Sequence, residues 1–289
     1  MMKKLIRKPE TERLGFLTLL IRKLETAKFI RRFPILLFAC LLLAVPAFAS
    51  YISLNTTLRS KVEGNNLKVI VQVVNKGDES AFAVQAEFRV GGKTLLAEKA
   101  PELPVNNLYS ATAVLPLNLA TPGNYPLILV MHYADANQYP FSALTAHAFV
   151  YRQEGVPPLF GQVKPATFAK DGTVDFVLKN SGNREIKAVT RLVVPRELTA
   201  LNDRVPLTLA PRSQQSAGFR LSNFSALAGS TYQLFAVTEF EDGGLHFTSL
   251  APGTVRINEG NLLVNYQALF IGLIIALIVG FIALQFRRK

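Results

Sequence analysis

Residues 67–90 read LKVIVQVVNKGDESAFAVQAEFRV, and this stretch decides the fold class. Before the turn at Asn75-Lys76-Gly77, apolar side chains occupy every second position: Leu67, Val69, Val71 and Val73. After the turn, apolar residues from Phe82 to Val90 alternate with polar ones: Gln85, Glu87 and Arg89. A period of two is typical of a β-strand with one buried face. Similar short segments, broken by Gly, Pro and Asn, continue to residue 257 and predict an all-β sandwich fold.

The same arrangement returns about 105 residues later, where Val174, Phe176 and Leu178 precede the turn Asn180-Ser181-Gly182. The later halves also correspond, since the segment 122–125 (PGNY) matches 228–232 (AGSTY), and 133–135 (YAD) matches 240–242 (FED). Shared spacing of apolar residues and turn glycines over whole domains indicates a tandem duplication. We therefore predict two similar β-sandwich domains, at residues 50–152 and 159–258, joined by a proline-containing linker at 153–158.

The strand, Asn-x-Gly turn and strand at Val69–Val90 and at Val174–Val194 resemble the cell-adhesion-related domains of bacteria and related immunoglobulin-like modules. Each copy is followed by a Pro-Gly or Ala-Gly turn and an aromatic strand, and the resemblance covers most of residues 60–257. It implies two tandem immunoglobulin-like β-sandwiches and a role in surface contacts or complex assembly. It supplies no catalytic residues, and a chain without tryptophan lacks the core of antibody domains.

The net charge of +12 is concentrated at the two ends of the chain. Residues 1–33 hold ten Lys or Arg against three acidic residues, and the last three residues are Arg287, Arg288 and Lys289. Between these ends, 19 basic residues face 17 acidic ones. Positive charge beside apolar segments is typical of cytoplasmic ends retained by the membrane potential, so nucleic acid is not an expected partner.

The first apolar segment, Pro34–Ala49, follows Arg31 and Arg32 and ends in Ala47-Phe48-Ala49 before Ser50. A basic region, an apolar core and a small-x-small exit predict a signal peptide cleaved between Ala49 and Ser50. The long basic region at residues 1–33 leaves an alternative, in which this segment remains as an uncleaved signal anchor. Both versions place the residues from 51 onward outside the cytoplasm.

The second apolar segment, Leu262–Phe286, has 25 residues without a charge. As a helix it would be about 37 Å long, enough to cross a hydrocarbon core of roughly 30 Å. The basic tail at residues 287–289 then stops transfer, which predicts a C-terminal transmembrane helix in the bacterial inner membrane. Small side chains recur every fourth residue and predict a helix-packing face, unless they reflect the ordinary abundance of Gly and Ala in such helices: Ala268, Gly272, Ala276 and Gly280.

Cysteine and histidine content argues against metal, cofactor and nucleophile sites. The single cysteine, Cys40, lies in the first apolar segment, so thiolate metal sites and disulfides are not expected in the β domains. His132 and Asp135 could contact a metal, although a hairpin residue is the alternative interpretation. An enzyme would require Asp135, Glu239, Asp242 or a histidine to converge in a deep cleft.

These patterns predict a noncatalytic extracytoplasmic protein that binds another protein or a cell-surface polymer through its two domains. The alternative is an accessory subunit of a membrane-embedded enzyme, transporter or export complex, docked through its transmembrane helix. Expected partners are the lipid bilayer and a protein, which could be a membrane subunit or a second copy. Because only residues 258–261 separate the second domain from the membrane segment, we expect that domain on the bilayer and the first domain farther out.

Overall fold

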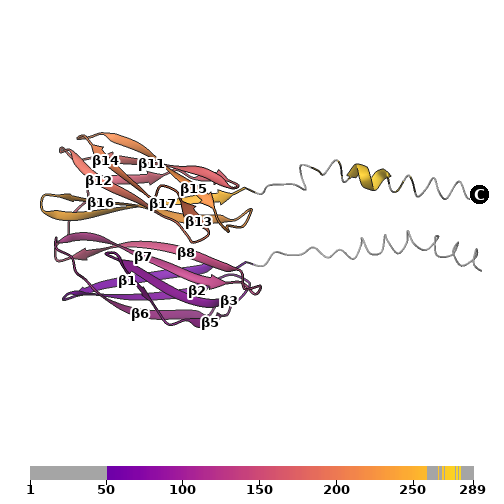
Figure 1. The fold of residues 1–289 in the computed structure, drawn as a ribbon. Helices are drawn as coiled ribbons and strands as arrows, with labels where there is room; N and C mark the ends of the chain where they lie inside the picture. Colours follow the sequence, from indigo (N-terminus) through magenta and orange to yellow (C-terminus); the bar gives the residue numbers. More distant parts are fainter. Residues whose placement is uncertain are drawn as a thin grey trace, which may run out of the picture. The chain divides into compact units, whose positions relative to one another are not determined.

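A computed structural model describes residues 51–258, together with residues 266, 269, 271–276, 278 and 280 of the C-terminal segment. All of them belong to the second of two units in the chain, which runs from Ser50 to Lys289. Residues 51–258 form strands, turns and bends without an α-helix (Figure 1). The predicted all-β fold class is confirmed for this range.

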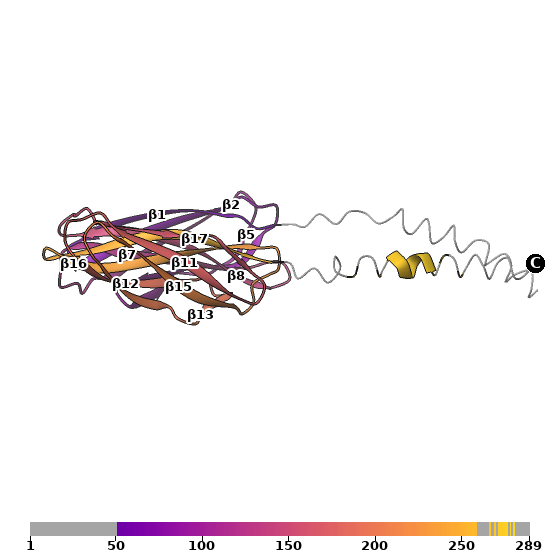
Figure 2. The same ribbon diagram turned by 90° about the horizontal axis from the view of Figure 1, so that it is seen from above.

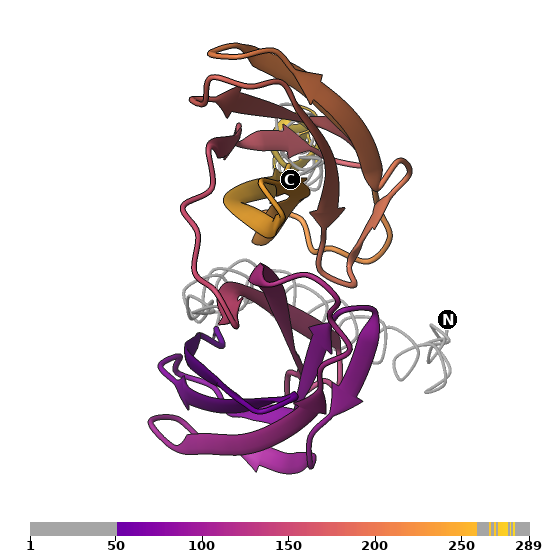
Figure 3. The same cartoon turned by 90° about the vertical axis from the view of Figure 1, so that its left-hand side faces the viewer.

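The N-terminal module, residues 51–152, consists of two sheets that enclose a buried core (Figure 3). One sheet has the order β1-β2-β6, and in the other β3 pairs with β4, β5 and β7, while β7 also pairs with β8. The alternating residues quoted above line the core, and Leu67, Val69 and Val71 have no exposed surface. The strands are β1 (Leu54–Glu63), β2 (Asn66–Asn75), β3 (Ala81–Val90), β4 (Lys93–Leu96), β5 (Ala100–Leu103), β6 (Leu108–Pro116), β7 (Gly123–Ala134) and β8 (Pro140–Tyr151).

The C-terminal module, residues 159–258, repeats this plan around a second core (Figure 3), and the strands of both modules run along the same long direction (Figure 2). One sheet has the order β13-β15-β11-β9, and the other contains β14-β12-β16-β17, with β10 running parallel to β17. Phe176 and Leu178 are fully buried in its core. The strands are β9 (Leu159–Val163), β10 (Ala166–Phe168), β11 (Asp171–Asn180), β12 (Ile186–Val193), β13 (Leu198–Ala200), β14 (Arg204–Leu209), β15 (Gln214–Asn223), β16 (Thr231–Asp242) and β17 (Leu245–Ile257).

The turn that the sequence repeats has the same structure in both modules. The side-chain amides of Asn75 and Asn180 are fully buried, and each donates to backbone carbonyls of the loops around it. The Oδ1 atom of Asn75 accepts the N–H of Gly77 at 3.0 Å, and that of Asn180 accepts the N–H of Gly182 at 2.9 Å. An asparagine that closes its own turn and ties it to neighbouring loops explains why this residue type recurs at both sites.

The two ends of the β region lie at the same end of the paired modules. Tyr51 lines one cleft together with Thr231, and Thr231 pairs directly with Arg256 near the end of β17. The N–H of Gly229 donates to the carbonyl of Ile257 at 2.8 Å. The modules pack side by side through an apolar layer rather than end to end. The expected order of the two modules from a bilayer stays a prediction.

Several sequence predictions fall outside the described residues, among them the basic region 1–33, the signal segment with Arg31, Arg32, Ala47, Ala49 and Ser50, and the tail residues Arg287, Arg288 and Lys289. In the segment 262–286, residues 271–276 are helical and exposed. Within the described part of the chain, no helix combines the length and the hydrophobicity needed for a membrane crossing.

Candidate binding surfaces at the junction of the two modules

An apolar layer joins the modules through the outer faces of two sheets. It is formed by buried side chains of β7 and β8 on one side and of β12 and β16 on the other: Ile128, Val130, Leu144, Val193, Phe235 and Val237. Because alternate residues of β7 and β16 also enter the module cores, the central parts of both strands are buried on both faces. This third layer joins the two modules, each with its own core, into one β unit. Polar groups of both modules lie at the margins of the layer.

At one end of this layer the two backbones come into contact at Gly123. A Cβ atom added to Gly123 would lie 1.9 Å from the carbonyl oxygen of His246, and φ is 141°, so only glycine fits here. The N–H of His246 donates to the carbonyl of Pro122 at 2.9 Å, and its ring stacks on Tyr125 with 4.0 Å between ring centroids. His246 therefore serves the contact between the modules.

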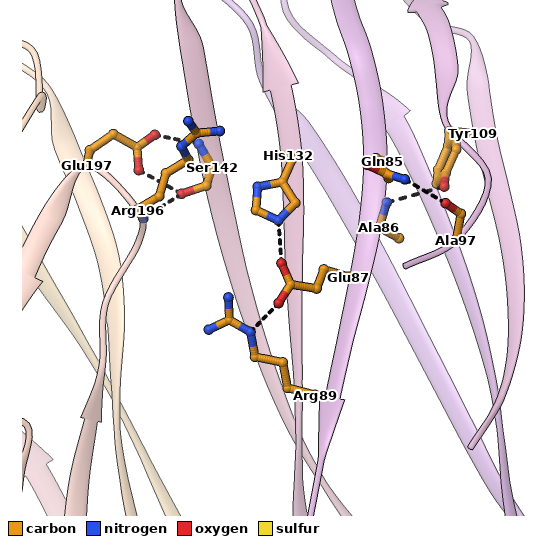
Figure 4. Close-up of polar contacts among 10 residues, drawn as sticks. All are labelled: Gln85, Ala86, Glu87, Arg89, Ala97, Tyr109, His132, Ser142, Arg196 and Glu197. Carbon is orange, nitrogen blue, oxygen red and sulfur yellow. Dashed lines mark hydrogen bonds and ion pairs between the residues drawn. The ribbon is translucent and has the colours of Figure 1, made fainter. Parts of the chain in front are cut away.

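At the other end, a buried carboxylate of the C-terminal module binds the N-terminal module (Figure 4). Glu197 has no exposed surface; its Oε1 accepts the N–H of Ser142, and its Oε2 accepts the Ser142 hydroxyl at 2.7 Å. The Ser142 hydroxyl in turn accepts the N–H of Arg196 at 3.0 Å. A buried carboxylate that is hydrogen-bonded through both oxygens fixes the register between the modules.

A second polar group lies on the outer face of β3 and β7 (Figure 4). Glu87 bridges His132 Nε2 at 2.6 Å and Arg89 Nε at 2.5 Å. Burial of the carboxyl alone would raise the pKa of Glu87, but the hydrogen bonds from Arg89 and His132 outweigh burial and hold that pKa below its usual value. Glu87 therefore stays ionised at neutral pH and holds Arg89 on this face of the sheet.

The structure does not bring His132 and Asp135 together as a metal site. His132 pairs with Glu87, whereas Asp135 closes the hairpin between β7 and β8 by accepting the N–H of Tyr139 at 2.8 Å. Among residues 51–258 and the described helical positions, no three His, Cys, Asp or Glu side chains form a group that could hold a metal ion. The hairpin interpretation of Asp135 is the one that matches its contacts.

The acidic residues that an enzyme would have required to converge are held by different partners. Glu239 Oε1 lies 3.4 Å from His246 Nε2 without hydrogen-bond geometry, and Asp242 pairs with Arg184 at 3.1 Å. His147 is exposed on β8. Of Asp135, Glu239, Asp242 and the three histidines, Asp135 is the one that lines the cleft at the end where Tyr51 lies.

That cleft, of about 490 Å³, lies between β7 and β8 of one module and the start of β16 in the other. Its walls carry Tyr133, whose ring stacks on Phe141 at 5.6 Å, and Tyr232. Burial raises the pKa of Tyr133 to about 12, and the nearby charge of Glu197 adds to the rise. The cleft is thus an aromatic recess in which burial raises the pKa of both Tyr133 and Tyr232 and so favours their neutral, hydrogen-bond-donating form.

A shallow groove of about 650 Å³ follows β4, β5 and β6 of the N-terminal module. It exposes Leu96 and Leu108, with 56% and 55% of their surfaces accessible. The Tyr109 hydroxyl holds the groove in shape by donating to the carbonyl of Glu98 at 2.8 Å, while it accepts the N–H of Ala86 (Figure 4). Exposed leucines beside edge strands are typical of a surface that receives an extended peptide segment.

Of the predicted helix-packing residues, Gly272, Ala276 and Gly280 are helical and exposed, while Ala268 lies outside the described residues. A Cβ atom added to Gly272 or Gly280 would meet no described atom within 4 Å. The packing face therefore remains a prediction. The junction itself was missed by the sequence reasoning, although apolar residues at consecutive positions of β7 and β16 were a signal for it.

No protein-family model matches this chain, and no curated protein matches it. Similar solved structures include Escherichia coli α2-macroglobulin activated by porcine elastase, with 10% identity over 73% of this chain and 23% of that chain, at a TM-score of 0.29. Another is red sea bream transglutaminase, with 16% identity over 73% of this chain and 32% of that chain, at a TM-score of 0.25. The chain thus spans less than a third of the length of either protein.

Proposed function

We propose that this chain is a noncatalytic interaction protein of the bacterial inner membrane, with two immunoglobulin-like β-sandwich modules on the periplasmic side. The observation that carries the proposal is the position of Tyr51 and Ile257 at one end of the paired modules. One apolar segment precedes Tyr51 along the chain, and the other follows Ile257. With this end at the bilayer, the sides of both modules are free to bind another protein or a cell-surface polymer.

Exposed apolar side chains at that end support contact with lipid. Phe224 is 78% exposed and Leu227 is 40% exposed. Their loop is tied to the end of β17, because Ser230 N–H donates to the Leu227 carbonyl and Ile257 N–H donates to the Ser230 carbonyl. The four residues 258–261 span at most about 14 Å, so this loop lies close to the start of the predicted membrane segment. Apolar side chains in such a position insert into the interfacial region of a bilayer.

A single tryptophan tests this orientation, because the chain has none of its own. In the full chain reconstituted into liposomes, the tryptophan of Phe224→Trp should emit at a shorter wavelength than it does in the unfolded chain in water. Brominated lipids should quench its fluorescence, since an indole ring prefers the membrane interface. The measurement is the quenched fraction as a function of bromine depth.

The matched control is Val156→Trp in the linker, where the native side chain is 86% exposed. The linker begins next to Tyr151, which pairs with Gly123 at the start of β7. The hairpin near the cleft follows the other end of β7, so the linker lies away from the proposed membrane contact. This tryptophan should remain in water and escape quenching. Equal quenching at both positions, or at neither, would contradict the proposed orientation.

The interaction itself is tested by purifying the full chain from detergent-solubilised membranes and identifying stable companions. The groove that exposes Leu96 predicts a protein companion, and Leu96→Glu should reduce its recovery about tenfold because a charge replaces apolar contact in the groove. Leu201→Glu is the control, since Leu201 is similarly exposed at 58% but lies in the other module. Recovery of the monomer alone in several detergents argues against the proposal.

The alternative function, an accessory subunit docked through the membrane helix, is distinguished in the same purification. Gly272 and Gly280 are helical with open space around their backbones, which would let a second helix approach closely. Replacing both with leucine should release a companion held through this face and leave one held through the groove. The two variants therefore assign a recovered companion to one surface or the other.

A further inference from the structure

A second cleft, of about 390 Å³, lies between the modules beside the apolar layer. The hairpin of β3 and β4 forms one wall, and β12, β14 and β16 contribute the other. Four cationic side chains and one acidic side chain line it: Arg89, Lys93, Arg191, Arg204 and Glu239. No motif in the sequence marks this set, because its members come from five strands or hairpins in two modules.

Two of these arginines face each other across neighbouring strands. Arg191 of β12 and Arg204 of β14 are direct partners in the antiparallel register, so their side chains leave the same face of the sheet. No described carboxylate lies within 4.0 Å of either guanidinium. Like charges directly opposite each other destabilise a sheet unless an anion lies between them.

A third guanidinium faces the same space from the other module. Arg89 is held on the outer face of β3 by its hydrogen bond to Glu87 at 2.5 Å (Figure 4). Lys93 sits at the rim, where its ammonium donates to the carbonyl of Pro116 at 3.0 Å. With the ionised Glu87 that pairs with Arg89 included, four positive charges face the two negative charges of Glu87 and Glu239 around this cleft.

We propose that this cleft binds a phosphate ester of a polyol or sugar. The guanidinium groups of Arg191 and Arg204 donate to the phosphate oxygens from one side and Arg89 donates from the other, because the planar fork of arginine matches phosphate geometry. Glu239, on the neighbouring strand β16, accepts a hydrogen bond from a hydroxyl of the ester. The cleft has the volume of an ordinary small-molecule site. This inference goes beyond the proposed function and does not depend on the membrane anchor.

Calorimetric titration of the full chain in detergent micelles tests the site, with glycerol 1-phosphate, inorganic phosphate and glycerol as probes. Glycerol 1-phosphate should bind saturably with a dissociation constant below about 1 mM at low salt, and glycerol should not bind. The double variant Arg191→Gln with Arg204→Gln should bind glycerol 1-phosphate at least about tenfold more weakly, because both bidentate donors are lost.

The matched control removes the same charge elsewhere, through Arg59→Gln with Arg220→Gln, two exposed arginines on β1 and β15. It should leave the affinity unchanged. Equal weakening in both double variants would overturn the proposal, because nonspecific charge attraction would then explain the binding. The absence of saturable binding of glycerol 1-phosphate up to about 10 mM would overturn it as well.

A variant that keeps the charge guards against misfolding as an explanation. Arg191→Lys with Arg204→Lys retains both positive charges but loses the forks, so the affinity should fall about threefold to tenfold while the ligand-free melting temperature stays near that of the unaltered chain. The glutamine double variant should melt at a higher temperature than the unaltered chain without ligand, because the repulsion is removed. A lower melting temperature for a correctly folded glutamine variant would show that Arg191 and Arg204 do not repel each other in the ligand-free chain. That result would contradict the proposal.

Glu239→Gln tests the role of the acidic residue. It should tighten the binding of inorganic phosphate, since a negative charge is removed, and it should lessen the preference for glycerol 1-phosphate over inorganic phosphate. An unchanged preference for glycerol 1-phosphate over inorganic phosphate would show that Glu239 does not bind a hydroxyl of the ester. Competition between bound glycerol 1-phosphate and either soluble poly(glycerol phosphate) or micellar phosphatidylglycerol then identifies the source: displacement by the polymer assigns an envelope polymer, and displacement by the lipid assigns a head group.

Discussion

Replacing Val237 with aspartate should separate the two modules while each keeps its own core. Val237 has no exposed surface and lies in the apolar layer with Ile128 and Val130. A carboxylate placed there has no partner, and an unpaired buried charge costs about 3 to 5 kcal/mol, which exceeds what a few apolar contacts return. The core residues of each module come from its own strands, so the contact between modules is the weaker element.

Calorimetry and distance measurements check this result. The unaltered chain should unfold its β region in one transition, and Val237→Asp should split it into two at lower temperature. Spin labels at positions 59 and 220, one in each module, should give a narrow distance distribution that broadens in the variant. Val114→Asp is the control: this valine is 54% exposed on β6, and its replacement should cost less than about 1 kcal/mol. A single unchanged transition in Val237→Asp would mean that the apolar layer does not hold the modules together.

The sequence predicts the module cores well because the information is local. Alternation from Leu67 to Val73 specifies which face of β2 is buried, and the same alternation from Val174 to Leu178 does so for β11. The turn asparagines were predicted as turn residues, and the structure adds that they are fully buried. A period of two and a turn signal need only neighbouring residues to be interpreted.

The junction could not be predicted in this way, because its partners are far apart in the chain. In the sequence, Glu197 is an ordinary polar residue between two strands of the C-terminal module, yet it is fully buried against Ser142 of the other module. His132 and Asp135 are close in sequence, but His132 pairs with Glu87, which is 45 residues away. Similarly, the opposition of Arg191 and Arg204 follows from the register between β12 and β14, which a single sequence does not specify.

The consecutive apolar residues of β7 illustrate the limit of pattern reading. Leu127 and Leu129 enter the N-terminal core, while Ile128 and Val130 between them enter the junction. An uninterrupted apolar run indicates burial on both faces. It does not name the surface that covers the second face, and here that surface belongs to a copy of the same fold about 105 residues later.

Replacing Asn180 with alanine should destabilise the C-terminal module by about 3 kcal/mol, because a fully buried amide loses all of its hydrogen bonds at once. The Nδ2 atom of Asn180 donates to the carbonyl of Arg184 at 2.8 Å and to that of Ala210 at 3.1 Å, and its Oδ1 accepts the N–H of Gly182 at 2.9 Å. The Nδ2 atom also donates to the carbonyl of Leu209 at 3.3 Å in a buried contact, and alanine removes this bond together with the others. Chemical denaturation followed by circular dichroism measures the loss in the free energy of unfolding.

Asn202→Ala provides the control, because Asn202 also donates to a carbonyl and accepts an N–H, at 3.0 and 2.6 Å, but at an exposed site. Water replaces those bonds, so the cost should stay below about 1 kcal/mol. Asn75→Ala should have a similar effect to Asn180→Ala, since the Asn75 side chain also donates to two carbonyls and accepts the N–H of the turn glycine. With the junction intact, both variants should lower the one shared transition. In the Val237→Asp background, each should lower only the transition of its own module, because separate cores no longer unfold together. A loss below about 1 kcal/mol for Asn180→Ala would show that the repeated asparagine is a turn former and not a core tie.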